Sequence, residues 1–288
     1  MNFEQLIASS IDGLTLGFVL GLMAMGLTLI FGVMKVINLG HGPFIVMGMF
    51  AILVLSRDFG INPYVGLPVV IVLGLFTGIV TYYVAVHRVI NAPELTTLLA
   101  TFSVNMLLVG ALTIIFSSSP FGLSLELPPW FRSGAITLTG TRGVAVLIAI
   151  AVTVALYAFL YRTRTGKSIR AVANNRAAAE LMGIDSTWIL ALSFGIGTAL
   201  AMVSGSLLAT LFGFTTLVGG GYEVKSFIIV VLGGLGNPIG ALFGGIIIGL
   251  LESLTTIVMP VSWVPVFEFV VFVMILLLRP TGIFGART

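Results

Sequence analysis

The chain has 288 residues, of which 58% are hydrophobic and 8% are charged, and its mean hydropathy is +1.20. Because soluble domains average about 25% charged residues, this composition excludes soluble enzymes and nucleic-acid-binding proteins and predicts one integral membrane domain over residues 1–288. The absence of cysteine and the presence of only two histidines speak against disulfides, metal sites and a cysteine nucleophile.

Uncharged apolar runs predict nine membrane segments. They lie near residues 11–34, 42–55, 64–86, 96–116, 143–161, 188–211, 225–236, 240–259 and 265–278. A simple spanning helix needs about 17–25 residues, and three segments, 42–55, 225–236 and 265–278, are shorter. We therefore expect an all-α polytopic protein of about eight or nine membrane elements, some of them broken at Gly and Pro; ten elements is the other alternative.

Glycine is patterned along these segments. A spacing of four residues, as in Gly13, Gly17 and Gly21 or in Gly245 and Gly249, places small residues on one helix face. Such faces let neighbouring helices approach closely. This spacing therefore predicts helix packing rather than a binding site.

Two glycine clusters differ from this spacing. Residues 38–43 and 233–238 each combine glycines with an Asn and a Pro at a membrane boundary. Transporters build substrate pathways from helices interrupted in this way, although a plain loop is an equal alternative. A short echo between residues 29–42 and 211–221, in segments expected to run in opposite directions, favours an inverted repeat.

Lysine and arginine predict the orientation, because cytoplasmic loops carry an excess of both. If residues 162–187 are cytoplasmic, nine of the 13 basic residues lie on that side and four lie outside. The nine are Lys35, Arg88, Arg162, Arg164, Lys167, Arg170, Arg176, Arg279 and Arg287, and the four are Arg57, Arg132, Arg142 and Lys225. The N-terminus is therefore expected outside and the C-terminus inside.

Two long loops connect the segments. The outer loop, residues 117–141, is rich in Pro and Ser and predicts a surface lid or a short interfacial helix. The inner loop, residues 162–187, is the most polar stretch, and its residues 168–182 predict an Ala-rich helix that ends at Gly183. Such a helix suits docking into a groove of another protein, and a solvated connector is the alternative. A Gly-Lys-Ser sequence in this loop lacks the preceding glycine of a phosphate-binding loop.

A few polar residues fall within or near the membrane segments. Glu252 lies mid-segment and is expected to line or support a pathway, or to hydrogen-bond a neighbouring helix. Glu268 is expected to be exposed at the interface, and Asn105 and Lys225 are further polar candidates. His41 is placed at an inner boundary, where it is expected to order the break at residues 38–43.

The sequence resembles the permease subunits of bacterial ABC importers for branched-chain amino acids. The resemblance rests on Asn38-Leu39-Gly40-His41-Gly42, on the loop from Gly166 to Asp185, on residues 231–241 and on residues 279–285. It covers nearly the whole chain. Urea and short-amide permeases look similar, so the resemblance is less specific for the substrate.

The resemblance implies a non-catalytic subunit of a bacterial cytoplasmic membrane. It implies pairing with a homologous second permease, two cytoplasmic subunits that bind and hydrolyse ATP, and an external substrate-binding protein, with no cofactor bound by this chain. The expected ATPase-coupling residues are Arg170, Ala173, Asn174, Arg176, Ala179 and Gly183, and the expected pathway residues are Asn38, His41, Asn105, Gly233, Gly234, Asn237 and Glu252. A stand-alone secondary transporter and a membrane-embedded enzyme are the alternatives, but no charged relay or catalytic cluster supports either.

Overall fold

A computed structural model describes residues 3–123, 125, 127–133, 136–279 and 282–284. Almost all of the described residues in the membrane segments are helical, as expected. The helices are α1 (Phe3–Met34), α2 (His41–Arg57), α3 (Pro63–Thr81) with a π-helical extension (Tyr82–Val86), α4 (Glu94–Phe116), α5 (Gly140–Arg162), α6 (Arg164–Asn174), α7 (Arg176–Leu181), α8 (Ser186–Leu211), α9 (Gly219–Gly233), α10 (Pro238–Val258) and α11 (Val264–Leu278), the last preceded by a 3₁₀ turn (Val261–Trp263).

Seven helical segments of the described chain are long and apolar enough to cross a membrane. The two other apolar helices are α2, with 17 residues, and α9, with 15 residues. Together they match the nine predicted segments. Two of the three segments predicted to be short, 42–55 and 225–236, are confirmed as short helices. The third, 265–278, is part of the helical segment Val261–Leu278, which is long enough to span. The segment predicted over residues 225–236 begins earlier, at Gly219, and ends at Gly233.

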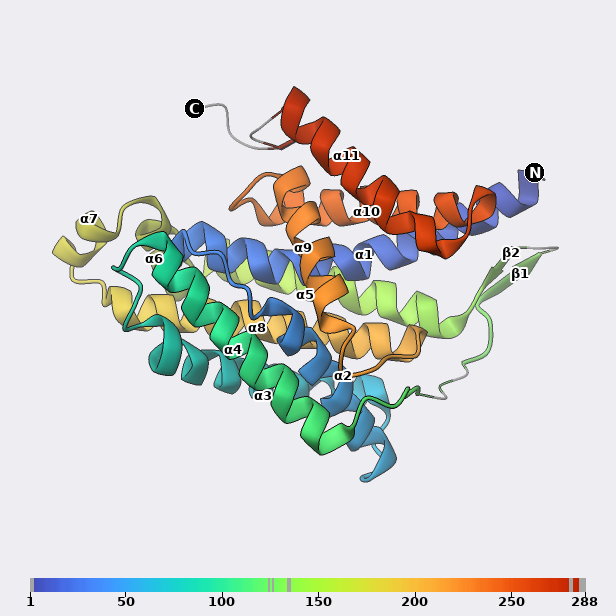
Figure 1. Cartoon of the computed structure of the whole chain (residues 1–288), viewed down its shortest axis with the longest axis horizontal. Coiled ribbons are helices and arrows are strands. Elements are labelled where there is room, and N and C mark those ends of the chain that lie inside the picture. Colours follow the sequence, from blue (N-terminus) through green and yellow to red (C-terminus); the bar gives the residue numbers. More distant parts are fainter. Residues whose placement is uncertain (1–2, 124, 126, 134–135, 280–281, 285–288) are drawn as a thin grey trace.

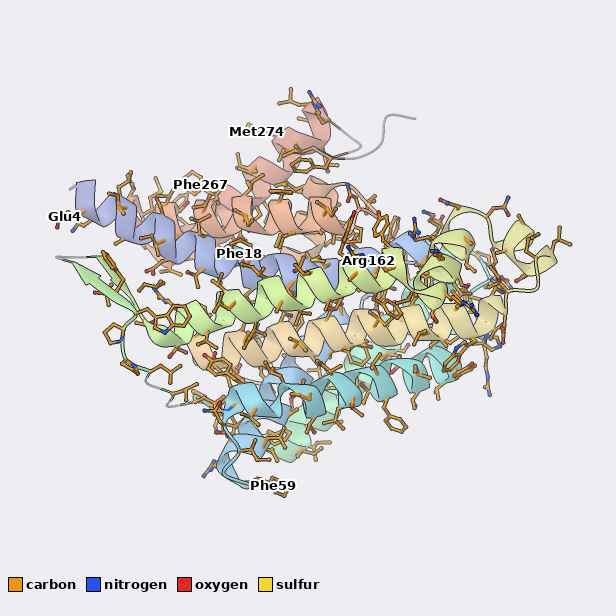
Figure 2. The ribbon with its side chains drawn as sticks, turned by 180° about the vertical axis from the view of Figure 1, so that it is seen from behind. Glu4, Phe18, Phe59, Arg162, Phe267 and Met274 are labelled. Atoms are coloured by element: carbon orange, nitrogen blue, oxygen red, sulfur yellow. The ribbon has the colours of Figure 1, made fainter. Side chains whose placement is uncertain are left out.

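The helices run mostly along the long axis of the molecule (Figure 1). The short helices α6 and α7 mark one end, which we call the α7 end, and a β-hairpin marks the other, the hairpin end. α1 begins at the hairpin end, and α11 finishes toward the α7 end. Figure 2 shows the same arrangement from behind, with Glu4 at the hairpin end and Arg162 on the side toward the α7 end.

Two helices form the centre of the bundle. In the most apolar 18-residue windows, 89% of α8 and 78% of α1 are buried, against 11% for α4 and for α11. Glycine permits this burial: a Cβ atom on Gly17 would lie 2.6 Å from the Cα atom of Ile246, and one on Gly249 would lie 2.4 Å from the backbone nitrogen of Gly17. The predicted glycine faces of α1 and α10 thus pack backbone to backbone, as small residues allow in membranes.

The outer loop contains strands where a short helix was one expectation. β1 (Phe131–Ser133) pairs antiparallel with β2 (Ile136–Leu138), with Phe131 opposite Leu138. No helix occurs in the part of residues 117–139 that the structure describes, so the interfacial-helix alternative is wrong there. Two consecutive prolines before Trp130 disfavour a helix, and the Phe, Ile, Thr and Leu residues that follow favour strands.

The inner loop holds two helices where one was predicted over residues 168–182. The break falls at Asn175, whose side-chain oxygen accepts a hydrogen bond from the backbone N–H of Ala178 (3.0 Å) and so caps α7. The predicted end at Gly183 is confirmed. Gly183 has a φ of +80°, and Ile184 donates its N–H to the carbonyl of Ala179 (3.1 Å), which is the hydrogen bond of a Schellman cap.

Candidate functional site: a polar junction between two short helices

The chain re-enters the bundle after α1. Residues 35–40 are non-helical, and α2 begins at His41. The His41 side chain is fully buried, and its Nε2 donates to the carbonyl of Met23 (3.1 Å). Met23 lies 11 residues before the end of α1 at Met34, which is about 16 Å at 1.5 Å per residue. The prediction that His41 lies at a membrane boundary is therefore wrong: it lies deep in the bundle.

Side chains of α4 hold this re-entrant segment. Thr101 accepts a hydrogen bond from the N–H of Leu39 (3.2 Å), and Asn105 donates from Nδ2 to the Leu39 carbonyl (2.5 Å). Asn38 closes the segment by accepting from the N–H of Gly40 (3.0 Å). The non-helical backbone thus receives the polar partners that it requires within a membrane.

Glu223 of α9 joins the same group. Its Oε2 accepts from Asn105 Nδ2 (2.9 Å) and from the backbone N–H of Gly42 (3.2 Å). Gly42 is the second residue of α2, where amide groups lack intrahelical partners and the helix dipole is positive. The carboxylate of one helix therefore satisfies the N-terminus of another.

The N-termini of α2 and α9 also touch directly. A Cβ atom on Gly42 would lie 2.4 Å from the carbonyl oxygen of Gly219, the first residue of α9. α2 runs toward the hairpin end and α9 away from it (Figure 1). Two short helices of opposite direction that meet inside the bundle agree with the inverted echo in the sequence, and discontinuous helices of this kind line pathways in many transporters.

A second charged cluster, which we call the Lys225 triad, lies between α9, α10 and α11. Lys225 Nζ lies 2.6 Å from Glu252 Oε2 and 3.2 Å from Glu268 Oε1. Glu268 is only 4% exposed, so its predicted exposure at the interface is wrong. The cation of Lys225 offsets the cost of burying the carboxylate. The triad borders a cavity of about 710 Å³ that also reaches Gly220 and Gly221.

The remaining predicted pathway residues lie elsewhere, in the turn between α9 and α10. Gly234 has a φ of +96°, and a Cβ atom on Gly233 would lie 2.4 Å from the backbone of Gly240. Asn237 caps α10 by accepting from the Gly240 N–H (3.1 Å) and donates to the carbonyl of Phe284 (3.0 Å). These contacts give the turn a structural role and do not join it to the Glu223 group.

Two arginines of the inner loop bind to the bundle itself. Arg170 stacks on the ring of Tyr161, 4.4 Å from its centroid, and donates from Nε to the carbonyl of Leu160 (3.1 Å). Arg176 donates from Nη1 to Asn91 (3.3 Å) and from Nε to Ser186 (3.1 Å). These contacts attach α6 to α5, and attach α7 to α8 and to the loop between α3 and α4.

The outer face of α7 differs from this attached face. Ala179 is buried within the chain, whereas Leu181 is 89% exposed and Met182 is 82% exposed. Glu180 accepts hydrogen bonds from Ser186 and Arg176, and these bonds, that from Ser186 first, hold the pKa of its carboxyl below the usual value. Of the other predicted coupling residues, Ala173 is half-buried and Asn174 is exposed.

Known proteins identify the family. The family described as "Branched-chain amino acid transport system / permease component" matches residues 9–278. The chain belongs to this family. The permease is 29% identical to the high-affinity branched-chain amino acid transport system permease protein LivH of Escherichia coli K12, over 99% of this chain and 97% of the relative.

Two further relatives span most of the permease. The probable branched-chain amino acid transport permease protein LivH of Methanocaldococcus jannaschii is 32% identical over 92% of this chain and 88% of the relative. BraD of Pseudomonas aeruginosa, a high-affinity branched-chain amino acid transport system permease protein, is 28% identical over 96% and 94%. No solved structure matches the chain. The predicted family and the multi-pass membrane architecture are confirmed.

Sequence reasoning about the permease missed Glu223. Its signal was present: an acid two residues after the run Gly219, Gly220 and Gly221, at the start of a mostly apolar stretch. The structure brings together Asn38, His41 and Asn105 of the predicted pathway set and adds Glu223 to them. Glu252 belongs to the separate Lys225 triad.

Proposed function

We propose that this chain is one membrane-spanning half of an ABC importer for branched-chain amino acids. The observation that carries the proposal is the similarity over at least nine-tenths of the chain to three permeases that are named for this transport. A homologous second permease completes the pathway, an external binding protein delivers the substrate, and two cytoplasmic subunits bind and hydrolyse ATP.

The α7 end faces the cytoplasm in this proposal, with the N-terminus outside. The Lys and Arg distribution supports this orientation, and α6 itself contributes Arg164, Lys167 and Arg170. Lys225, counted outside from the sequence, belongs to a buried ion-pair cluster and no longer bears on orientation. Arg287 lies outside the described residues.

Helix α7 is the proposed contact for an ATP-binding subunit. Leu181 and Met182 leave two large apolar side chains almost fully exposed on a polar loop, and exposed apolar side chains mark contact sites when they gather. Arg176 of α7 bonds Ser186 of α8 and Asn91 of the loop before α4. A displacement of α7 by a bound subunit would therefore be transmitted to α8 and to α4. α4 in turn contacts the re-entrant segment through Thr101 and Asn105.

The polar junction of α2, α4 and α9 is the proposed part of the pathway that changes during transport. Its backbone groups are held by the side chains of Asn105 and Glu223, which other hydrogen-bond partners can replace when helices move. The Lys225 triad and its cavity lie beside it and support the pathway.

A reconstituted importer tests the α7 contact. The permease is assembled in proteoliposomes with its second permease, ATP-binding subunits and binding protein, and ATP-driven leucine uptake is measured. The double change Leu181→Glu and Met182→Glu should abolish uptake and reduce co-purification of the ATP-binding subunits. Phe59→Glu is the matched control, because Phe59 is 69% exposed in the loop after α2, at an edge of the molecule far from α7 (Figure 2). Undiminished uptake in the double variant would exclude α7 as the contact.

Competition for uptake tests the substrate. Excess unlabelled leucine, isoleucine or valine should suppress uptake of labelled leucine in the wild-type importer, whereas urea and acetamide should not. Uptake of urea in place of leucine would assign the chain to the urea and short-amide permeases.

A further inference from the structure

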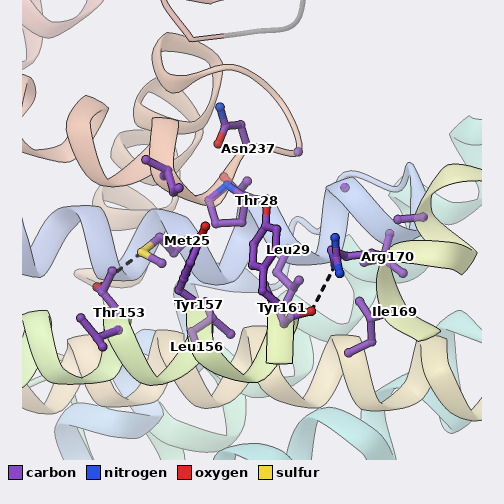
Figure 3. Close-up of a pocket in the computed structure, with 18 residues that line it drawn as sticks. Met25, Thr28, Leu29, Thr153, Leu156, Tyr157, Tyr161, Ile169, Arg170 and Asn237 are labelled. Atoms are coloured by element: carbon purple, nitrogen blue, oxygen red, sulfur yellow. Dashed lines mark hydrogen bonds between the residues drawn. The ribbon is translucent and has the colours of Figure 1, made fainter. Parts of the chain in front are cut away.

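An amphipathic slot lies at the α7 end of the bundle, between α1, α5, α6 and the turn that precedes α10 (Figure 3). Its volume is about 420 Å³. Most of its lining is apolar, with Arg170 at the end formed by α6 and Asn237 at the turn before α10 (Figure 3). The slot is separate from the α2–α4–α9 junction and from the Lys225 triad.

The slot opens sideways, toward the surroundings of the bundle. Tyr157 and Tyr161 of α5 are each 46% exposed, and Val154, one turn before them, is 60% exposed. The two tyrosine rings stack at 4.4 Å and extend from α5 toward the Asn237 turn (Figure 3). Because tyrosine prefers the boundary between apolar and polar membrane regions, these rings place the slot near one membrane surface.

One polar group inside the slot lacks a partner. Thr28 of α1 lines the slot and is fully buried, yet its hydroxyl has no hydrogen-bond partner among the described residues. Buried hydroxyl groups in folded proteins are almost always hydrogen-bonded. An oxygen atom of a molecule in the slot would supply the missing partner.

The segment from the end of α5 through α6 carries an excess of positive charge, and one of its cations, that of Arg170, lines the slot. Arg162, Arg164, Lys167 and Arg170 lie on consecutive turns of α5 and α6. Within the part of the chain that the structure describes, no carboxylate forms an ion pair with any of the four. Arg170 uses its Nε on the Leu160 carbonyl, which leaves its Nη groups available for a phosphate. Basic pockets at a membrane surface bind anionic lipid headgroups.

We propose that the slot binds one anionic phospholipid, with its phosphate at Arg170, an ester oxygen at Thr28 and an acyl chain between α1 and α5. The order of the groups supports this pose. Thr28 lies six residues before the end of α1, about 9 Å inside it, so the hydroxyl sits deeper than the arginine, as an ester sits deeper than a phosphate. The inference does not depend on the transported substrate.

Native mass spectrometry of the purified permease tests the proposal. Protein extracted from mixed vesicles of phosphatidylglycerol and phosphatidylcholine should retain one phosphatidylglycerol molecule and no phosphatidylcholine. Arg170→Gln should weaken this retention about tenfold, because a charge-assisted hydrogen bond is lost. Thr28→Val, which keeps the side-chain shape, should weaken it to a smaller extent. Equal retention of the two lipids by the wild type would overturn the proposal without recourse to any variant.

Matched controls separate the slot from other sites. Thr77→Val removes a hydroxyl from α3, and Arg57→Gln removes a guanidinium from the last residue of α2. Neither residue lines the slot, so both variants should leave retention unchanged. Millimolar inorganic phosphate should not displace the lipid. Displacement by phosphate alone would show a free-phosphate site, and loss of retention in the control variants would show general annular binding; either result would refute the assignment.

Discussion

The interface between α1 and α10 and the junction of α2, α4 and α9 both hold helices together within the bundle, but through different contacts. The first brings Gly17 and Gly249 together so closely that a single methyl group would collide with backbone. The second also has one close backbone contact, between Gly42 and Gly219. Its other connections are side-chain hydrogen bonds, which Asn105 donates to the Leu39 carbonyl and to the carboxylate of Glu223. Close-packed backbones fit in one arrangement, because packed interfaces deform little. Hydrogen bonds can exchange partners, so the junction is the region suited to movement.

The largest effect is expected from Gly205→Leu. A Cβ atom there would lie 2.0 Å from the carbonyl oxygen of Ile45 on α2, and backbone cannot yield as a side chain can. We expect no monodisperse permease on size-exclusion chromatography. Gly110→Leu is the control, because Gly110 is also helical but has open space around its Cβ position. Normal purification of Gly205→Leu would show that the close backbone contact between α8 and α2 can adapt to a larger side chain.

Lys225→Met is expected to have the next largest effect. It leaves Glu252 and Glu268 close together without their cation, and loss of one partner from a buried ion pair costs about 3–5 kcal/mol. The melting temperature in detergent should fall, and the triple change Lys225→Met, Glu252→Gln and Glu268→Gln should restore it.

The single change Glu252→Gln tests whether the carboxyl group of Glu252 is needed for transport. It leaves Lys225 paired with Glu268, so we expect substantial leucine uptake across pH at fixed ATP. An inactive Gln variant, or wild-type uptake that requires a proton gradient, would assign Glu252 to proton coupling instead.

Asn105→Leu should act on the polar junction with a smaller effect on stability. It leaves the Leu39 carbonyl and Glu223 without their shared donor, which costs about 1–3 kcal/mol for buried groups. Hydrogen exchange of α4 should accelerate and uptake should fall. Ser103→Ala is the control on the same helix, because Ser103 is exposed and bonds only to the Leu99 carbonyl. Equal exchange rates in the two variants would show that the hydrogen bonds of Asn105 do not stabilise the junction.

The smallest effect is expected at Glu180, on the exposed surface of α7. Its folded-state pKa is lowered from 4.5 by Ser186 and Arg176, so its contribution is present above the unfolded-state pKa and is lost as pH falls through the lowered value. The protection of the amides of residues 176–184, measured as the exchange rate relative to the intrinsic rate at the same pH, should therefore fall at acidic pH in the wild type. Glu180→Gln should show the lower protection already at neutral pH, with little further pH dependence.

The glycine face of α1 that packs against α10 was predictable from the sequence. The meeting of Asn105 with Glu223 in the polar junction was not. The spacing of Gly13, Gly17 and Gly21 is a local pattern that predicts a packing face, and Gly183 is a local stop signal. Asn105 and Glu223 are 118 residues apart, and no local pattern reveals that they meet. Helix capping explains why the inner loop holds two helices instead of one, because the side chain of Asn175 interrupts a helix that composition alone would continue.

The closest packing partner of α1, helix α10, is synthesised near the end of the chain. The glycine face of α1 is complete once residue 21 has been made, but the matching face on α10 includes Gly245 and Gly249, more than 220 residues further along the chain. At a synthesis rate of about 5–20 residues per second, the first helix waits roughly 10–45 s in the bilayer with its closest contact surface unfilled. During that interval the insertion machinery or lipid must cover the glycine face of α1. Any chain that terminates before α10 therefore presents this surface permanently to membrane quality control.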